Sequence, residues 1–115
     1  PAAHRQAATD PQMEAARSML DSVCEEPLSI GAVAEALSMS AVQFTRRFRQ
    51  TFGVTPARYV EKIRLDQVCH LLTHTNLTIE RIAQACGFSS GFYLSRYFTL
   101  KMQMPPSAYR QQYKV

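Results

Sequence analysis

The sequence lacks several patterns that would place it in a common class of protein. No apolar run approaches the roughly 18 residues that a membrane-spanning helix needs, and the first residues, PAAHRQAATD, contain no apolar segment typical of a secretory signal. No stretch of β-branched residues alternates with polar ones, so no half-buried strand is predicted. We therefore expect an all-α, cytoplasmic protein the size of one ordinary domain, with no membrane partner.

Cysteine and histidine are too few and too scattered to predict a disulfide or a metal site. Cys24, Cys69 and Cys86 form no CxxC pair. His70 and His74 are spaced i, i+4, but they lack the intervening glutamate of an HExxH motif and a third ligand nearby. We interpret the cysteines as buried thiols in a reducing compartment and the histidines as surface residues. No metal and no cofactor are expected.

The residues needed for most kinds of catalysis are also missing. No Ser/His/Asp set, paired carboxylates or glycine-rich phosphate loop can be assembled from nine acidic residues, three histidines and four glycines. The protein is therefore predicted not to be an enzyme.

Charge is distributed unevenly along the chain. Residues 1–27 hold two basic and five acidic groups, a net charge of −3, whereas residues 28–115 hold eleven basic and four acidic groups, a net charge of +7. A basic body of this kind favours a polyanionic partner.

Apolar residues recur with helical spacing throughout, and cap and stop residues divide the chain into about seven helices. Asp10 followed by Pro11 is typical of a helix start, and Pro27 should end that helix. A longer segment, ARYVEKIRLDQVCHLLTHT, predicts an unbroken helix of about 17 to 19 residues, near 26 Å at 1.5 Å per residue. Further caps are expected at Ser29, Ser40, Thr55 and Thr78, with stops at Gly53 and Asn76.

The chain contains an internal repeat of about 50 residues. Ile30/Ile79, Ala34/Ala83, Met39/Phe88 and Ser40/Ser89 are separated by 49 positions, and Phe44/Leu94, Arg46/Arg96 and Phe48/Phe98 by 50. One residue has therefore been inserted near the sequence SSG, at the start of a helix in the second copy. Phe44, Phe48, Phe52, Leu94 and Phe98 are expected in the core.

Each copy has the pattern of a helix-turn-helix motif: a short helix, a turn of about three residues and a second helix. If Phe44 and Phe48 point inward, the flanks and exposed face of the first copy's second helix carry Ala41, Val42, Thr45, Arg46 and Arg49. In such motifs the second helix enters the major groove of DNA. Arg46 could then offer its guanidinium to a guanine, and the methyl groups of Val42 and Thr45 suit a thymine methyl. Ser40 and Ser89, at helix starts, could present backbone N–H groups to phosphates.

The two segments LSIGAVAEALSMSAVQFTRRFRQTFGVTPARYV and LTIERIAQACGFSSGFYLSRYFTLKMQMPPSAYR resemble the two helix-turn-helix halves of the AraC/XylS family of bacterial transcription regulators. The motif IAxxxGFSSxxYLSRxF, followed by PPSAYR, carries this resemblance. It implies base-reading residues at Val42, Thr45 and Arg46 in the first half, and at Gly91, Phe92, Ser95 and Arg96 in the second. The full predicted DNA-binding set is Ser40, Ala41, Val42, Thr45, Arg46, Arg49, Ser89, Ser90, Gly91, Phe92, Ser95 and Arg96.

The resemblance implies an organisation and a set of partners. Residues 1–9 are expected to be the end of a linker from a missing N-terminal sensing or dimerisation domain. Residues 10–55 and 76–115 are expected to form two helix-turn-helix subdomains, joined by a connecting helix over 56–75. The expected function is sequence-specific binding of double-stranded DNA, with two recognition helices in successive major grooves about 34 Å apart. RNA polymerase is an expected partner, and the first recognition helix should discriminate more between sequences than the second.

Some residues depart from the family pattern, and two other functions stay open. Ser38 replaces a turn glycine, which should cost of order 1 kcal/mol if the turn is left-handed. In the second copy Gln103 stands where the first has Gly53, and Pro105 replaces the cap Thr55, so the signals that end one helix and start the next in the first copy are not repeated. A similar double module occurs in bacterial DNA-alkylation repair proteins, where a cysteine reacts. The basic face could also bind an acidic protein partner.

Overall fold

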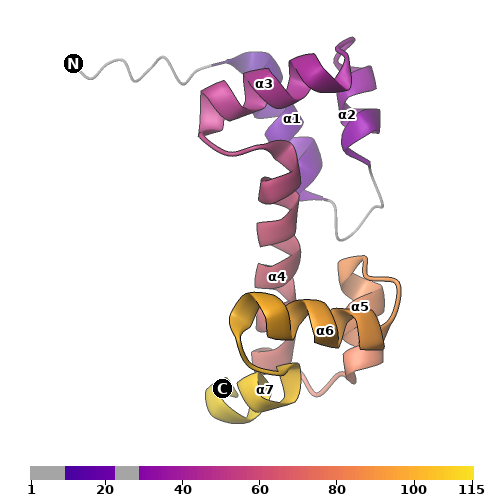
Figure 1. The fold of residues 1–115 in the computed structure, drawn as a ribbon, viewed down its shortest axis with the longest axis vertical. Coiled ribbons are helices and arrows are strands. Elements are labelled where there is room, and N and C mark those ends of the chain that lie inside the picture. The colour runs from indigo at the N-terminus through magenta and orange to yellow at the C-terminus, as the bar shows by residue number, and fades with distance from the viewer. Residues whose placement is uncertain (1–9, 23–28) are drawn as a thin grey trace, which may run out of the picture. The chain divides into compact units, whose positions relative to one another are not determined.

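The computed structural model describes residues 10–22 and 29–115, which form seven α-helices and no strand (Figure 1). The prediction of an all-α fold is therefore confirmed for this part of the chain, in which no helix is long and apolar enough to span a membrane. The expected linker over residues 1–9 and the expected stop at Pro27 lie outside the described residues. The helices are α1 (Pro11–Asp21), α2 (Ile30–Ala36), α3 (Ala41–Phe52), α4 (Pro56–His74), α5 (Ile79–Cys86), α6 (Gly91–Met102) and α7 (Pro106–Tyr113).

The chain divides into two compact units, Pro1–Lys62 (unit 1) and Ile63–Val115 (unit 2). The division falls inside α4, so the long helix contributes its first residues to unit 1 and its remaining residues to unit 2. Each unit contains one copy of the repeat: α2 and α3 in unit 1, and α5 and α6 in unit 2.

The helix starts follow from side chains that bond to the first free backbone N–H groups of each helix. Such bonds satisfy donors that have no partner within the helix. Asp10, Ser29, Ser40 and Thr78 all make the predicted capping bond. At α3 the cap is reciprocal, because Ser40 Oγ accepts from the backbone of Gln43 (3.1 Å) and Gln43 Oε1 accepts from the backbone of Ser40 (3.0 Å).

The core of unit 1 is built around the phenylalanines of α3. Phe44 and Phe48 are fully buried, with ring centroids 5.7 Å apart and edge-to-face packing. Phe52, predicted as core, is only half-buried, and the guanidinium of Arg17 lies 4.8 Å from its ring centroid. Among the described residues of the unit, the other fully or almost fully buried side chains are Met13, Ala16, Leu20, Val33, Ala34, Pro56 and Val60.

The core of unit 2 repeats this arrangement with Leu94 and Phe98 of α6 in the equivalent positions, both fully buried as predicted. The ring of Phe98 packs edge-to-face against Tyr109 of α7, with centroids 5.5 Å apart. The remaining buried residues of the unit come from all four helices: Val68, Leu72, Thr73, Ile82, Ala83, Cys86, Gly91 and Pro106.

The carbonyl groups at the C-terminal end of α4 accept hydrogen bonds from residues near the end of the chain. The last carbonyls of a helix have no partner within it. Arg110 supplies two of the missing donors, Nε to the carbonyl of Leu72 (3.0 Å) and a terminal nitrogen to the carbonyl of Thr75 (3.2 Å). Lys114 Nζ donates to the same Thr75 carbonyl (2.6 Å), and the backbone N–H of Val115 donates to the carbonyl of Thr73 (3.0 Å).

The turns between the paired helices share a left-handed residue and one backbone hydrogen bond in both units. After α2, Ser38 adopts φ +59° and the N–H of Met39 donates to the carbonyl of Ala34 (2.9 Å). After α5, Gly87 adopts φ +84° and the N–H of Phe88 donates to the carbonyl of Ala83 (2.9 Å). Both residues have the left-handed backbone conformation that favours glycine, so the condition under which Ser38 carries a backbone cost is met.

The position of the inserted residue is clear from the caps. Ser90, not Ser89, caps α6, because its side chain accepts from the backbone N–H of Tyr93 (3.0 Å). The prediction that pairs Ser40 with Ser89 at the helix start is therefore wrong by one residue. Ser89 is the extra residue of the turn, and the two caps are 50 positions apart.

Helices α3 and α6 both end at a residue in the left-handed conformation, Gly53 for α3 and Gln103 for α6. The φ of Gln103, +63°, matches the left-handed conformation of Gly53, φ +81°. The next helix, α7, begins at Pro106 without a side-chain cap, because Pro105 precedes it.

Replacing Ser38 by glycine should stabilise the protein. A non-glycine residue in the left-handed region costs about 1–2 kcal/mol, and part of this gain is offset by the greater freedom of glycine in the unfolded chain. We expect the free energy of unfolding to rise by about 0.5–1 kcal/mol in urea denaturation. Gly53→Ala is the matched control: it introduces only the backbone cost, since nothing lies within 4 Å of a Cβ at that position, and it should destabilise. Equal effects of the two substitutions would contradict the argument.

Candidate nucleic-acid interface

The predicted residues of α3 gather on one exposed surface. Ala41, Val42, Thr45, Arg46 and Arg49 line a shallow groove together with Gln50. All of them are exposed except Thr45, which is half-buried. Gln50 was not predicted, although it lies four residues after Arg46 and therefore on the same side of the helix; that spacing could have identified it.

Arg46 and Arg49 are the cations of this surface. Both side chains are exposed, and the structure records no carboxylate within ion-pair distance of either among the described residues. A guanidinium in this position retains all its donors for a polyanion or for the edges of bases.

Arg47, in contrast, is used inside unit 1. It donates to Asp10 Oδ2 (2.8 Å) and to Gln12 Oε1 (2.9 Å), two residues at the start of α1. From the sequence, Arg47 and Arg49 lie further along the helix than Arg46 and are expected to suit phosphates. The internal contacts of Arg47 do not support this role for it. The hydrogen bond from Arg47 holds the pKa of Asp10 below its ordinary value of 3.8, against the opposing effect of burial.

Acid should remove the stability that the Asp10 carboxylate contributes. Because the pKa of Asp10 is lower in the folded state, its contribution is complete above pH 3.8 and is lost as the pH falls through the lower, folded value. Asp10→Asn keeps a good helix cap but removes the charge. We expect it to lower the free energy of unfolding by roughly 1 kcal/mol at pH 7, with the difference from the unsubstituted protein vanishing in denaturation curves at the most acid pH. A difference independent of pH would contradict this.

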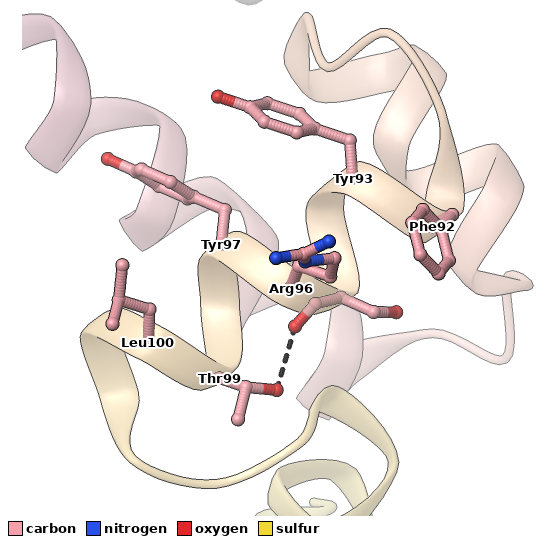
Figure 2. Close-up of a pocket in the computed structure, with 7 residues that line it drawn as sticks. Phe92, Tyr93, Arg96, Tyr97, Thr99 and Leu100 are labelled. Carbon is pink, nitrogen blue, oxygen red and sulfur yellow. Dashed lines mark hydrogen bonds between the residues drawn. The ribbon is translucent and has the colours of Figure 1, made fainter.

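The equivalent exposed surface of unit 2 lies on α6 and is more apolar than the surface on α3 (Figure 2). The predicted residues Phe92, Ser95 and Arg96 line a shallow groove with four unpredicted ones, Tyr93, Tyr97, Thr99 and Leu100. Arg96 is exposed, and its guanidinium carbon lies 5.8 Å from the centroid of the Phe92 ring. Figure 2 shows Arg96 between Phe92 on one side and Tyr97 on the other. Thr99 and Leu100 could have been identified as the equivalents of Arg49 and Gln50, 50 residues earlier.

Gly91 is the predicted residue that the structure sets apart from the others. It is buried, and its backbone N–H donates to Glu80 Oε1 of α5 (2.9 Å). A Cβ at this position would lie 2.8 Å from that oxygen and 3.2 Å from the backbone N and Cα of Glu80. Gly91 therefore permits close packing of α6 on α5 and does not belong to the exposed surface. The predicted serines differ as well: Ser40 and Ser89 are exposed, whereas Ser90 is half-buried and uses its side chain as the cap.

The cysteines and histidines do not form a chemical site in the part of the chain that the structure describes. Cys24 lies outside this part; Cys86 is buried and Cys69 is half-buried. Burial raises the pKa of Cys69 above its ordinary value of 9.0, although a hydrogen bond with Tyr109 acts in the opposite direction. The rings of His70 and His74 stack with centroids 4.3 Å apart, and no group of three possible metal ligands occurs among residues 10–22 and 29–115.

Cys69 should react slowly with alkylating reagents. A thiol with a raised pKa holds less thiolate at pH 7 than the few per cent of a free cysteine, and the thiolate is the reactive form. In a Cys24→Ser variant we expect iodoacetamide to label folded protein more slowly than urea-unfolded protein, with the rate rising as the pH is increased. One fast-reacting cysteine at pH 7 would instead favour the alkylation-repair alternative.

Two helix pairs, each with a left-handed residue in its turn and an exposed arginine on its second helix, define a protein with a duplicated helix-turn-helix motif. Residues 33–112 match a family model described as a helix-turn-helix domain. The chain belongs to the AraC type of this family of helix-turn-helix domains.

Relatives and solved structures show the same likeness. The chain is 39% identical over 80 residues to the HTH-type transcriptional activator RhaS of Escherichia coli, covering 70% of this chain and 29% of RhaS. It is also similar to a transcriptional regulator of Chromobacterium violaceum with an AraC-type DNA-binding domain, with 34% identity, a TM-score of 0.76, and 89% and 91% of the two chains covered. The DNA-binding domain of the global transcriptional factor AdpA, solved with a target DNA, is 30% identical with a TM-score of 0.78, covering 91% and 94% of the two chains. The chain thus spans less than a third of the length of RhaS.

Proposed function

We propose that this chain binds double-stranded DNA in a sequence-specific manner, as the output domain of a larger bacterial transcription regulator. The observation that carries the proposal is the repetition of one exposed arginine. Arg46 and Arg96 each lie two residues after a fully buried core residue, Phe44 or Leu94, on the second helix of a helix-turn-helix pair. In such pairs this helix enters the major groove. The complex of the related AdpA domain with DNA supports the proposal.

The residues proposed to contact DNA are those of the two exposed surfaces. On α3 we propose that Arg46 reads a base, that Val42 and Thr45 contact a thymine methyl, and that Arg49 contacts a phosphate. On α6 Phe92, Ser95 and Arg96 take the equivalent roles. Ser40, Ala41, Ser89 and Ser90 lie next to the helix starts, where backbone N–H groups suit phosphate oxygens.

The partners of the complete regulator are also proposals. An N-terminal sensing or dimerisation domain and a contact with RNA polymerase are supported by RhaS, a transcriptional activator more than three times the length of the matched region. The reading of two successive major grooves, with the recognition helices about 34 Å apart, stays a prediction of the sequence.

Selection of bound sites from random DNA, followed by footprinting, tests the proposal. We expect one preferred site, with two protected major-groove segments about one turn apart. The logarithm of the affinity should fall linearly with the logarithm of the salt concentration. The affinity for the selected site should stay higher than the affinity for random DNA. Equal binding to all sequences would contradict specific recognition, and protection of a single groove would assign recognition to one unit alone. Salt-sensitive binding to an acidic protein but not to DNA would favour the protein-interaction alternative.

A further inference from the structure

The outermost line of side chains on α6 places one hydrogen-bonding residue between two apolar ones. Phe92, Arg96 and Leu100 are spaced i, i+4 and i+8, and so follow one another along the same side of the helix. Phe92 is 72% exposed and Leu100 is 74% exposed. Both apolar side chains therefore lie in solvent, on the side of α6 opposite the buried Leu94 and Phe98.

The same line on α3 has a different chemistry. There Val42 is followed by Arg46 and Gln50, and Arg49 lies beside them, so three side chains offer hydrogen-bond donors. On α6 the residue equivalent to Arg49 is Thr99, whose hydroxyl already donates to the backbone carbonyl of Ser95 (2.7 Å; Figure 2).

We infer that α6 selects its half of the DNA site mainly through the 5-methyl groups of thymine, with Arg96 reading a single guanine between them. This inference rests on the proposed function. Thymine is the base that presents a methyl group in the major groove, and apolar side chains contact it there. Phe92 and Leu100 are separated by eight residues, about 12 Å along the helix axis, which corresponds to three or four base-pair steps of 3.4 Å. Thymines are therefore expected on both sides of the guanine.

The contact between Phe92 and Arg96 supports this division of roles. With the guanidinium carbon 5.8 Å from the ring centroid, the ring and the cation lie within the range of a cation–π interaction. The ring can cover the methyl group of a thymine next to the guanine that the guanidinium reads. Because RNA carries uracil, which has no methyl group, and has a narrow major groove, this surface should also discriminate against double-stranded RNA.

Exchange of thymine for deoxyuridine tests the inference, because it removes only the methyl group. The guanine read by Arg96 is first identified in the selected duplex as the base pair whose substitution no longer matters in Arg96→Ala, and the α6 half-site is taken as this pair with about four base pairs on each side. Each thymine in that half is then replaced by deoxyuridine. For each contacted methyl group we expect affinity to fall about fourfold in the unsubstituted protein. When the replaced thymine is the one that Phe92 contacts, Phe92→Ala should bind the thymine and deoxyuridine duplexes equally well. Phe92→Leu should recover part of the preference for thymine.

Phe92 is exposed, so these variants should keep the fold, which circular dichroism and thermal melting would check. Deoxyuridine that costs nothing anywhere in the α6 half-site would overturn the inference. An equal cost in Phe92→Ala and in the unsubstituted protein would also overturn it, because the methyl groups would then act through the shape of the DNA. A different result would contradict the proposed function: no selected sequence would bind more tightly than random DNA.

Discussion

Arg46→Ala is expected to weaken binding to the selected DNA site by about 1–3 kcal/mol, or roughly 5- to 150-fold, and to relax the preference at one base pair. The guanidinium can form two parallel hydrogen bonds with the O6 and N7 atoms of a guanine, a geometry that no other side chain reproduces. Arg46 is exposed and free of carboxylate partners among the described residues, so its removal should leave the free energy of unfolding almost unchanged. Titration of the selected duplex and of its single-base variants measures the effect.

Two further variants separate base reading from general attraction to DNA. Arg46→Lys keeps the charge but loses the planar fork, so it should lose the base preference while keeping part of the affinity. Arg49→Ala should weaken binding to every sequence by a similar factor and lower the salt dependence by about one unit. If Arg46→Ala also reduced the affinity for all sequences equally, Arg46 would be a phosphate contact.

Gly91→Ala is expected to lower the free energy of unfolding by about 1–3 kcal/mol, the usual cost of overpacking. The added Cβ would lie 3.2 Å from the backbone of Glu80, which cannot rotate away, so α6 must move a few tenths of an ångström from α5. The carboxylate of Glu80, 2.8 Å from the same Cβ, would also have to release the N–H of residue 91. Because this N–H lies at the start of α6, DNA affinity should fall as well. Urea denaturation and duplex titration measure the two effects.

Gly31→Ala provides the matched control. Gly31 also lies in the first turn of a helix, but a Cβ there would be 3.8 Å from Ser29 Oγ, an ordinary contact. The substitution should stabilise by up to about 1 kcal/mol through helix propensity. In Gly91→Ala/Glu80→Ala the carboxylate is absent but the backbone contact stays, so only part of the stability should return. A stabilising Gly91→Ala would show that α5 and α6 have room to separate.

The features predicted correctly from the sequence are those that depend on neighbouring residues. Asp10, Ser29 and Ser40 were identified as caps because each bond joins residues only three positions apart. The burial of Phe44 and Phe48 follows from helical spacing in the same way. Two adjacent serines, however, satisfy the local pattern equally well. In the structure Ser90 and not Ser89 is the cap, because its side chain accepts from the backbone N–H of Tyr93.

The contacts that the sequence did not predict join distant residues. Arg47 and Asp10 are 37 positions apart and come from different helices, so nothing in the local pattern of α3 separates Arg47 from Arg46 or Arg49. Family resemblance places Gly91 among the base-reading residues, but in the structure it is buried against Glu80 of α5. The equivalent Ala41 has the same spacing from its core residue and is exposed, so helical spacing alone does not predict this burial.

The hydrogen bonds from Arg110, Lys114 and Val115 to the end of α4 make that helix end and the last residues of the chain open together. The bonded groups, at residues 72–75 and 110–115, are 35 to 42 positions apart in the sequence. Fraying of the final residues therefore exposes the carbonyls of Leu72, Thr73 and Thr75 to water, and unwinding of α4 from that end releases α7. Amide protons in both segments should consequently exchange with solvent as a single cooperative block.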